Sequence, residues 1–147
     1  MNRHYYTIGC DFIGLNISDI SSLDMSFLGA FCNQMIRFFE ELQQSFPEEK
    51  SISMGLEAIK AAKRSNPKLI LDLFYEYLYV PAHDLIANRK DDEIILLARK
   101  IMSSQFNELM PALMIFDKYW PSMSQSNRDV IWQYLDVLCK LCEKARA

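Results

Sequence analysis

Apolar residues recur every three or four positions along most of the chain, which is the spacing of one buried face of a helix. The first such stretch spans about Asp24–Phe46, and its stripe consists of Leu28, Phe31, Cys32, Met35, Ile36, Phe39 and Leu42. Ser22 or Asp24 supplies an oxygen to cap its start, and Pro47 ends it because a residue before proline avoids the α region. We therefore predict a long amphipathic helix here.

The next two predicted helices are delimited by prolines. The second helix spans about Glu48–Ser65, with acids in its first turn and cations in its last, where the helix macrodipole favours each. Asn66 followed by Pro67 signals the start of a third helix, because the fixed φ of proline suits the first helical position. We expect this helix to break or kink near Val80, since Pro81 lacks a backbone donor.

Three more helices are predicted in the C-terminal half of the chain. One opens at Asp91, and another spans about Glu108–Tyr119 and is closed by Trp120-Pro121. The last helix begins with a capping box, Ser126–Asp129, and continues to the end of the chain. Its apolar stripe consists of Val130, Ile131, Tyr134, Leu135, Leu138, Leu141 and Cys142. The chain is thus predicted to be all-α, as a compact bundle of five to seven helices.

Residues 4–17 follow a different pattern, with the period of a β-strand. Apolar side chains occupy every second position, at Tyr6, Ile8, Cys10 and Phe12. Because the sequence contains no second run of this kind, we predict an extended arm over residues 1–18 and a helical core over residues 22–147, within a single domain. The arm either lies on its own core or pairs with another molecule. In the second case the candidate partner-binding residues are Tyr5, Tyr6, Ile8 and Phe12.

The composition is consistent with long helices. Half of the 147 residues are hydrophobic and 24% are charged, while Gly occurs only 4 times and Pro 5 times. All-β domains need many tight turns, so this scarcity favours helices. The sequence contains no apolar run long enough for a transmembrane helix, and its beginning lacks the apolar region of a signal peptide. We therefore expect a protein of a reducing compartment, with its four cysteines as free thiols.

The sets of catalytic and metal-binding residues are incomplete. Cys139 and Cys142 form a CxxC, but they lie near a helix C-terminus, where the macrodipole opposes a thiolate, and no second ligand pair accompanies them. His83-Asp84 lacks a nucleophile motif beside it. The acidic run Asp91–Glu93 lacks the alternating ligands and the Gly of a calcium-binding loop. We therefore predict no catalytic site, no metal site and no cofactor.

Two surface features bear on the choice of partner. A basic tract consists of Lys60, Lys63, Arg64 and Lys68, but it lacks interleaved aromatic residues and the net charge of the chain is −3. We do not expect a nucleic-acid partner, because phosphate binding normally requires a stronger positive field. Three tyrosines cannot all lie on one helical face, so at least one points outward: Tyr75, Tyr77 and Tyr79. An outward-pointing tyrosine favours a protein partner or self-association.

The C-terminal third contains a Trp, a short polar turn and an Ile-Trp-x-Tyr-Leu helix, at Trp120, residues 121–127 and Ile131–Leu135. Together with Phe74–Glu93, this region resembles a group of small, uncharacterised proteins of large DNA viruses. The resemblance implies a viral, non-enzymatic protein of the host cytoplasm or the virion. We expect a protein–protein interaction module, as a viral structural or assembly protein and a minor virion component. The alternative is a viral regulator of transcription or host cell death that acts through a helical groove or a basic face.

Overall fold

The computed structural model describes residues 26–104 and 110–147, and every secondary-structure element in this part of the chain is a helix. Its elements are α2 (Ser26–Ser45), α3 (Lys50–Ser65), α4 (Pro67–Phe74), the π-helix η2 (Tyr75–Tyr79), α5 (Val80–Ala87), α6 (Asp91–Ser104), α7 (Met110–Lys118), the 3₁₀-helix η3 (Trp120–Ser122) and α8 (Gln125–Arg146). The predicted all-α bundle is confirmed. The predicted arm, residues 1–18, lies outside the described residues. No described helix has the length and apolar character needed to cross a membrane.

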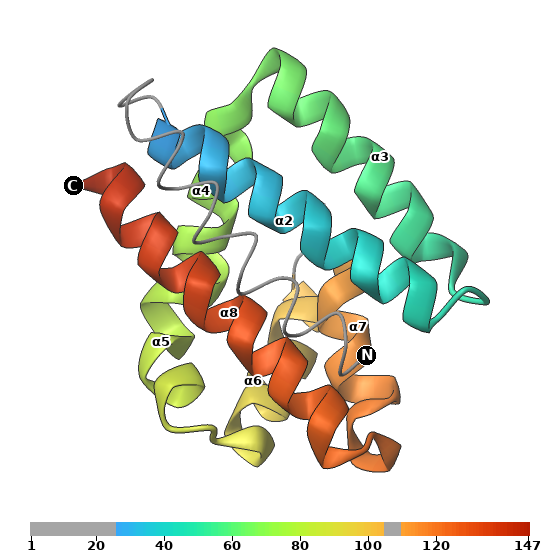
Figure 1. Cartoon of the computed structure of the whole chain (residues 1–147). Helices are drawn as coiled ribbons and strands as arrows, with labels where there is room; N and C mark the ends of the chain where they lie inside the picture. The colour runs from blue at the N-terminus through green and yellow to red at the C-terminus, as the bar shows by residue number, and fades with distance from the viewer. Residues whose placement is uncertain (1–25, 105–109) are drawn as a thin grey trace.

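Helix α2 is the central element of the bundle. It contacts α8, α3 and α4, and α8 lies beside it in the opposite direction, so the start of α2 and the end of α8 share one end of the molecule (Figure 1). The thiol of Cys32 donates to the carbonyl of Pro67 over 3.5 Å, which ties α2 to the start of α4. Helices α5, α6 and α7 complete the bundle around the other half of α8 and the far end of α2 (Figure 1).

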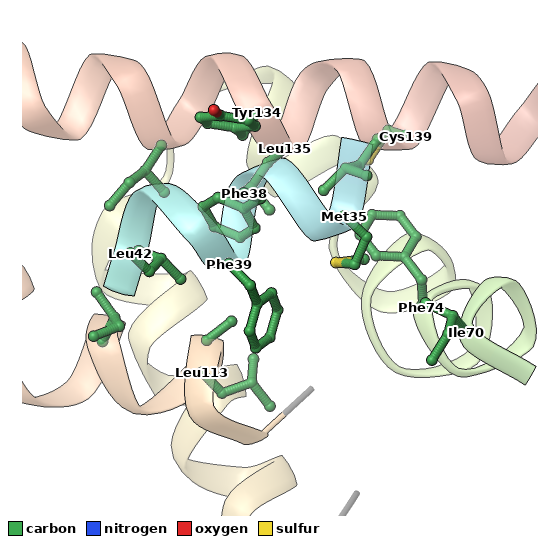
Figure 2. Packing of buried hydrophobic residues seen from close by; sticks show 14 of the residues in the cluster. Met35, Phe38, Phe39, Leu42, Ile70, Phe74, Leu113, Tyr134, Leu135 and Cys139 are labelled. Atoms are coloured by element: carbon green, nitrogen blue, oxygen red, sulfur yellow. The ribbon is translucent and has the colours of Figure 1, made fainter. Parts of the chain in front are cut away.

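The core forms where the apolar stripe of α2 meets α4, α7 and α8. Figure 2 shows Phe39 of α2 directed toward Leu113 of α7, and Met35 beside Phe74 of α4. The rings of Phe31 and Phe74 pack edge to face, with centroids 5.3 Å apart. Of the stripe predicted for the first helix, five residues are buried and two are half-buried, Leu28 and Ile36. The amphipathic pattern therefore identified the correct face of α2.

Of the break or kink predicted near Val80, the break does not occur. Helices α4, η2 and α5 follow one another without interruption from Pro67 to Ala87, and the amide of Val80 donates to the carbonyl of Tyr75, five residues earlier. Proline has no N–H and its ring clashes with the carbonyl four residues before it in a regular α-helix. The wider π-helical turn in front of Pro81 changes this register and carries the helix past the proline. The helix therefore does not break near Val80, while the other half of the prediction, a kink at this point, stays a prediction.

Two predicted helix starts are also shifted. Helix α3 begins at Lys50 rather than at Glu48. Helix α8 begins at Gln125, and its N-cap is Ser124, whose hydroxyl accepts a hydrogen bond from the amide of Asn127 over 3.2 Å. The predicted capping box at Ser126–Asp129 is therefore wrong, because an earlier serine already satisfies a free amide of the first turn. The caps predicted for the first helix lie outside the described residues.

We expect Gly29→Ala to raise the free energy of unfolding by about 0.5–1 kcal/mol, because glycine inside a helix loses more backbone freedom on folding than alanine does. Gly29 lies within α2, and a methyl group added to it meets no atom within 4 Å. Urea denaturation followed by circular dichroism measures the change. A loss of stability would show that the space beside Gly29 is occupied.

Candidate interaction surface around the π-helical turn

Three aromatic rings form a parallel stack along η2 and α5, which we call the aromatic ladder: Tyr75, Tyr79 and His83. The ring centroids of Tyr75 and Tyr79 are 5.6 Å apart with an interplanar angle of 14°. The rings of Tyr79 and His83 are 4.6 Å apart with an angle of 9°. Residues four apart are neighbours on a helix surface, so a helix that passes Pro81 unbroken places these rings one above another.

Side chains from the end of α8 hold the ladder in place. The Arg146 guanidinium lies 3.6 Å from the ring centroid of Tyr75 and contacts Asp72 at 3.2 Å. The hydroxyl of Tyr79 donates to a carboxylate oxygen of Glu143 over 2.8 Å. This hydrogen bond, with burial and the nearby carboxylate charge, raises the pKa of Tyr79 to about 12. Tyr79 is therefore a neutral donor at physiological pH. Its ring lies between those of Tyr75 and His83, and its hydroxyl is held by Glu143.

The His83 ring ends the ladder and has a defined orientation. Its Nδ1 lies 2.7 Å from the backbone carbonyl of Tyr79, and its Nε2 lies 3.4 Å from Asp84. A carbonyl oxygen only accepts hydrogen bonds, so Nδ1 carries the proton in this pair. The Asp84 side chain is 85% exposed, and within the described residues the polar contacts of His83 are with the Tyr79 carbonyl and Asp84. The histidine is thus held as a stacking group of the ladder.

The surface beside the ladder combines fixed aromatic rings with exposed apolar atoms. Tyr75, Tyr79 and His83 are half-buried, and the adjacent Val80 is 54% exposed. Tyr77 is half-buried too and packs against the core cluster, so each of the three tyrosines of which at least one was expected to point outward is half-buried. Tyrosine and arginine are, with tryptophan, enriched at the energetic centres of protein interfaces. The arrangement therefore suits a contact with another protein.

The CxxC of α8 lies inside the bundle. Cys139 is 8% exposed and Cys142 is fully buried. Burial is the main cause that raises the pKa of Cys139 to about 12 and that of Cys142 to about 11. Thiolates, rather than thiols, attack disulfides and bind zinc. Among the described residues, no group of three or more His, Cys, Asp or Glu is placed to hold a metal ion.

We expect the purified protein to contain no stoichiometric zinc, because the two buried thiols of Cys139 and Cys142 resist ionisation and lie without a second ligand pair among the described residues. Metal analysis by mass spectrometry on protein purified without chelators is the measurement. One zinc per chain would contradict this placement of the CxxC.

The remaining predicted site residues do not converge. The predicted partner-binding residues Tyr5, Tyr6, Ile8 and Phe12 lie outside the described residues. Asp91 accepts hydrogen bonds from the indole of Trp120 over 3.1 Å and from Arg128 over 3.4 Å, so its carboxylate joins α6 to η3 and α8. In the basic tract, Lys63 donates to the side chain of Asn33, and Lys60 lies 3.8 Å from Glu57. Two of the four cations of the basic tract therefore already have a polar partner within the chain.

No family model, no curated protein and no solved structure matches the chain. The aromatic ladder is therefore characterised by its geometry alone. In the sequence, the ladder is visible as the four-residue spacing of Tyr75, Tyr79 and His83. The sequence analysis considered the tyrosines together but did not connect His83 with them. The contributions of Glu143 and Arg146 come from tertiary structure, since both lie more than 60 positions from their partners.

Proposed function

We propose that the chain is a non-enzymatic protein–protein interaction module that binds its partner through the aromatic ladder and the adjacent Val80. The observation that carries this proposal is the parallel stack of Tyr75, Tyr79 and His83, fixed by Arg146 from α8. Ring side chains that are already ordered lose little conformational entropy when a partner covers them. The exposed Val80 side chain, next to Tyr79 in the chain, adds apolar area beside the ladder.

We further propose that the module is a viral structural or assembly protein. The support for this step is the resemblance of Phe74–Glu93 and of the Trp120–Leu135 region to small proteins of large DNA viruses. The ladder lies within the first of these segments. A structural protein is expected at stoichiometric levels in purified virus particles, whereas a regulator of transcription or cell death is not. Quantitative mass spectrometry of purified particles distinguishes the two roles.

The test of the interaction surface is Val80→Asp, with Leu96→Asp as its matched control. Val80 is 54% exposed and Leu96 on α6 is 64% exposed, so both substitutions place a carboxylate at a solvent-accessible position. We expect Val80→Asp to weaken self-association or partner capture at least tenfold, because a desolvated carboxylate opposes an apolar contact. Leu96→Asp is expected to behave like the parent protein.

Analytical ultracentrifugation measures self-association, and capture by the tagged full-length chain followed by mass spectrometry measures partner binding. Circular dichroism establishes that both variants are folded. If Val80→Asp retains every association of the parent protein, the ladder is not the contact surface. If both variants lose binding equally, the effect is one of general surface charge and the assignment to the ladder fails.

A further inference from the structure

A row of exposed side chains runs beside the aromatic ladder on η2 and α5. The parallel stack of Tyr75, Tyr79 and His83 shows that residues four apart lie over one another in this stretch of helix. The residues that follow these three by one position are therefore aligned in the same way. All of them are exposed, and we call them the outer row: Glu76, Val80 and Asp84.

The outer row places a carboxylate on either side of an apolar side chain. Asp84 contacts the His83 ring at 3.4 Å, whereas the carboxylate of Glu76 has no ion pair or hydrogen bond within the described residues. A partner that covers Val80 also removes water from these two carboxylates, and a desolvated carboxylate needs a cation opposite it. The outer row therefore suits an apolar side chain that is flanked by Lys or Arg.

The basic tract at the junction of α3 and α4 has the complementary pattern. Its members Arg64 and Lys68 are exposed, and neither side chain forms an ion pair or a hydrogen bond within the described part of the chain. Ala61 is exposed too and lies one helical turn before Arg64. A side chain as small as that of alanine lets another helix approach closely. The tract thus offers an apolar position with positive charges beside it.

The two surfaces are too far apart to pair within one molecule. Lys68 and Val80 are twelve positions apart on continuous helical elements, which is about 18 Å at 1.5 Å per residue. Figure 1 shows α4 starting next to the end of α3, and α5 farther along the same side of the molecule. A lysine side chain is much shorter than this separation. The charges of the outer row can therefore be matched by those of the basic tract only between two copies.

We propose that the outer row of one copy binds the basic tract of a second copy, with Ala61 against Val80 and Arg64 beside Glu76. Each of the two charged residues lies within one helical turn of its apolar neighbour, so both contacts form together. The net charge of −3 is small, and salt at physiological concentration screens the remaining repulsion between copies. The proposal rests on the proposed function, because it assigns a partner to the surface around Val80.

This contact joins two different surfaces, so it is heterologous. Each copy in a pair keeps one free outer row and one free basic tract, and further copies add head to tail into a ring or a filament. Growth of this kind is what an assembly protein requires. A two-fold dimer, by contrast, would bury the same surface on both copies and would stop at two chains.

The test uses charge reversal on each surface separately. We expect Glu76→Lys and Arg64→Glu each to weaken self-association about tenfold in analytical ultracentrifugation, because each places like charges opposite one another. The matched controls are Glu93→Lys and Lys100→Glu, the same reversals at exposed positions of α6, and we expect them to associate like the parent protein. Circular dichroism establishes that all variants are folded. If Arg64→Glu unfolds, Lys68→Glu replaces it, since the first turn of α4 favours a carboxylate.

Mixing the two variants distinguishes this contact from a general effect of charge. An equimolar mixture brings the intact basic tract of the Glu76→Lys chain to the intact outer row of the Arg64→Glu chain. We expect the mixture, and a chain that carries both changes, to associate within about threefold of the parent protein, because opposite charges again face one another.

Three results overturn the proposal: a monomeric parent protein, single variants that associate like the parent, or a mixture that associates no better than either variant alone. A monomeric parent that captures another protein, and loses it in Val80→Asp, removes the second copy as partner and leaves the proposed function standing. Charge variants that behave as expected while Val80→Asp has no effect retain the second copy and remove the aromatic ladder from the contact. The two failures are therefore distinguishable.

Discussion

Leu138→Ala is expected to lower the free energy of unfolding by about 2–5 kcal/mol, the range for truncation of a fully buried leucine. Leu138 has no exposed surface and belongs to the core cluster. It lies in α8, the helix that contacts both α2 and α5. The substitution removes apolar contacts and leaves a cavity that rigid helices on two sides cannot close, so the cost lies above that of apolar transfer alone.

Urea denaturation followed by circular dichroism at 222 nm, a standard helix signal, measures this change. Lys140→Ala is the matched control, because Lys140 is exposed on the same helix and alanine keeps the helix propensity high. The control is expected to stay within about 0.5 kcal/mol of the parent protein. If Leu138→Ala also changed the free energy of unfolding by no more than about 0.5 kcal/mol, α8 would present a different face to the core.

The burial of Leu138 could be predicted from the sequence because a helix stripe is a local pattern. All seven residues of the stripe predicted for the last helix are buried. Two further buried residues, Trp132 and Cys139, were not part of the predicted stripe, and at helical spacing both lie beside one edge of it. Helix α8 contacts α2 and also η2 and α5, and Arg89 lies over the Trp132 ring at 5.3 Å. An apolar stripe in the sequence predicts one buried face of a helix, but it does not show that a second element also packs against that helix.

The candidate surfaces were less accessible to sequence reasoning than the core. Pro81 suggested a break or kink, yet the response of a helix to proline depends on whether a π-helical turn forms before it, and Tyr75 and Tyr79 both lie in this turn. At the aromatic ladder, the pairing of elements distant in sequence, α8 with η2, supplies Glu143 and Arg146.

The second large effect is expected at Trp120, whose truncation to alanine should cost about 3–5 kcal/mol. Trp120 is 1% exposed, and its ring packs edge to face on Trp132 with centroids 5.2 Å apart. Its indole N–H donates to Asp91 over 3.1 Å, and the Arg128 guanidinium lies 5.2 Å from its ring. The side chain thus joins η3 to the start of α6 and to α8. Trp120→Ala removes both the apolar contacts and the hydrogen bond.

Trp120→Phe separates these two contributions. Phenylalanine keeps an aromatic ring against Trp132 but lacks the N–H that Asp91 accepts, while Arg128 still contacts the Asp91 carboxylate at 3.4 Å. Because that carboxylate retains a charged partner, we expect the Phe variant to lose less than half of what the Ala variant loses in urea denaturation. In both variants Trp132 is the one remaining tryptophan and reports unfolding by fluorescence. An Ala variant within about 1 kcal/mol of the parent protein, or a Phe variant as unstable as the Ala variant, would contradict a role in which ring packing dominates and the hydrogen bond is secondary.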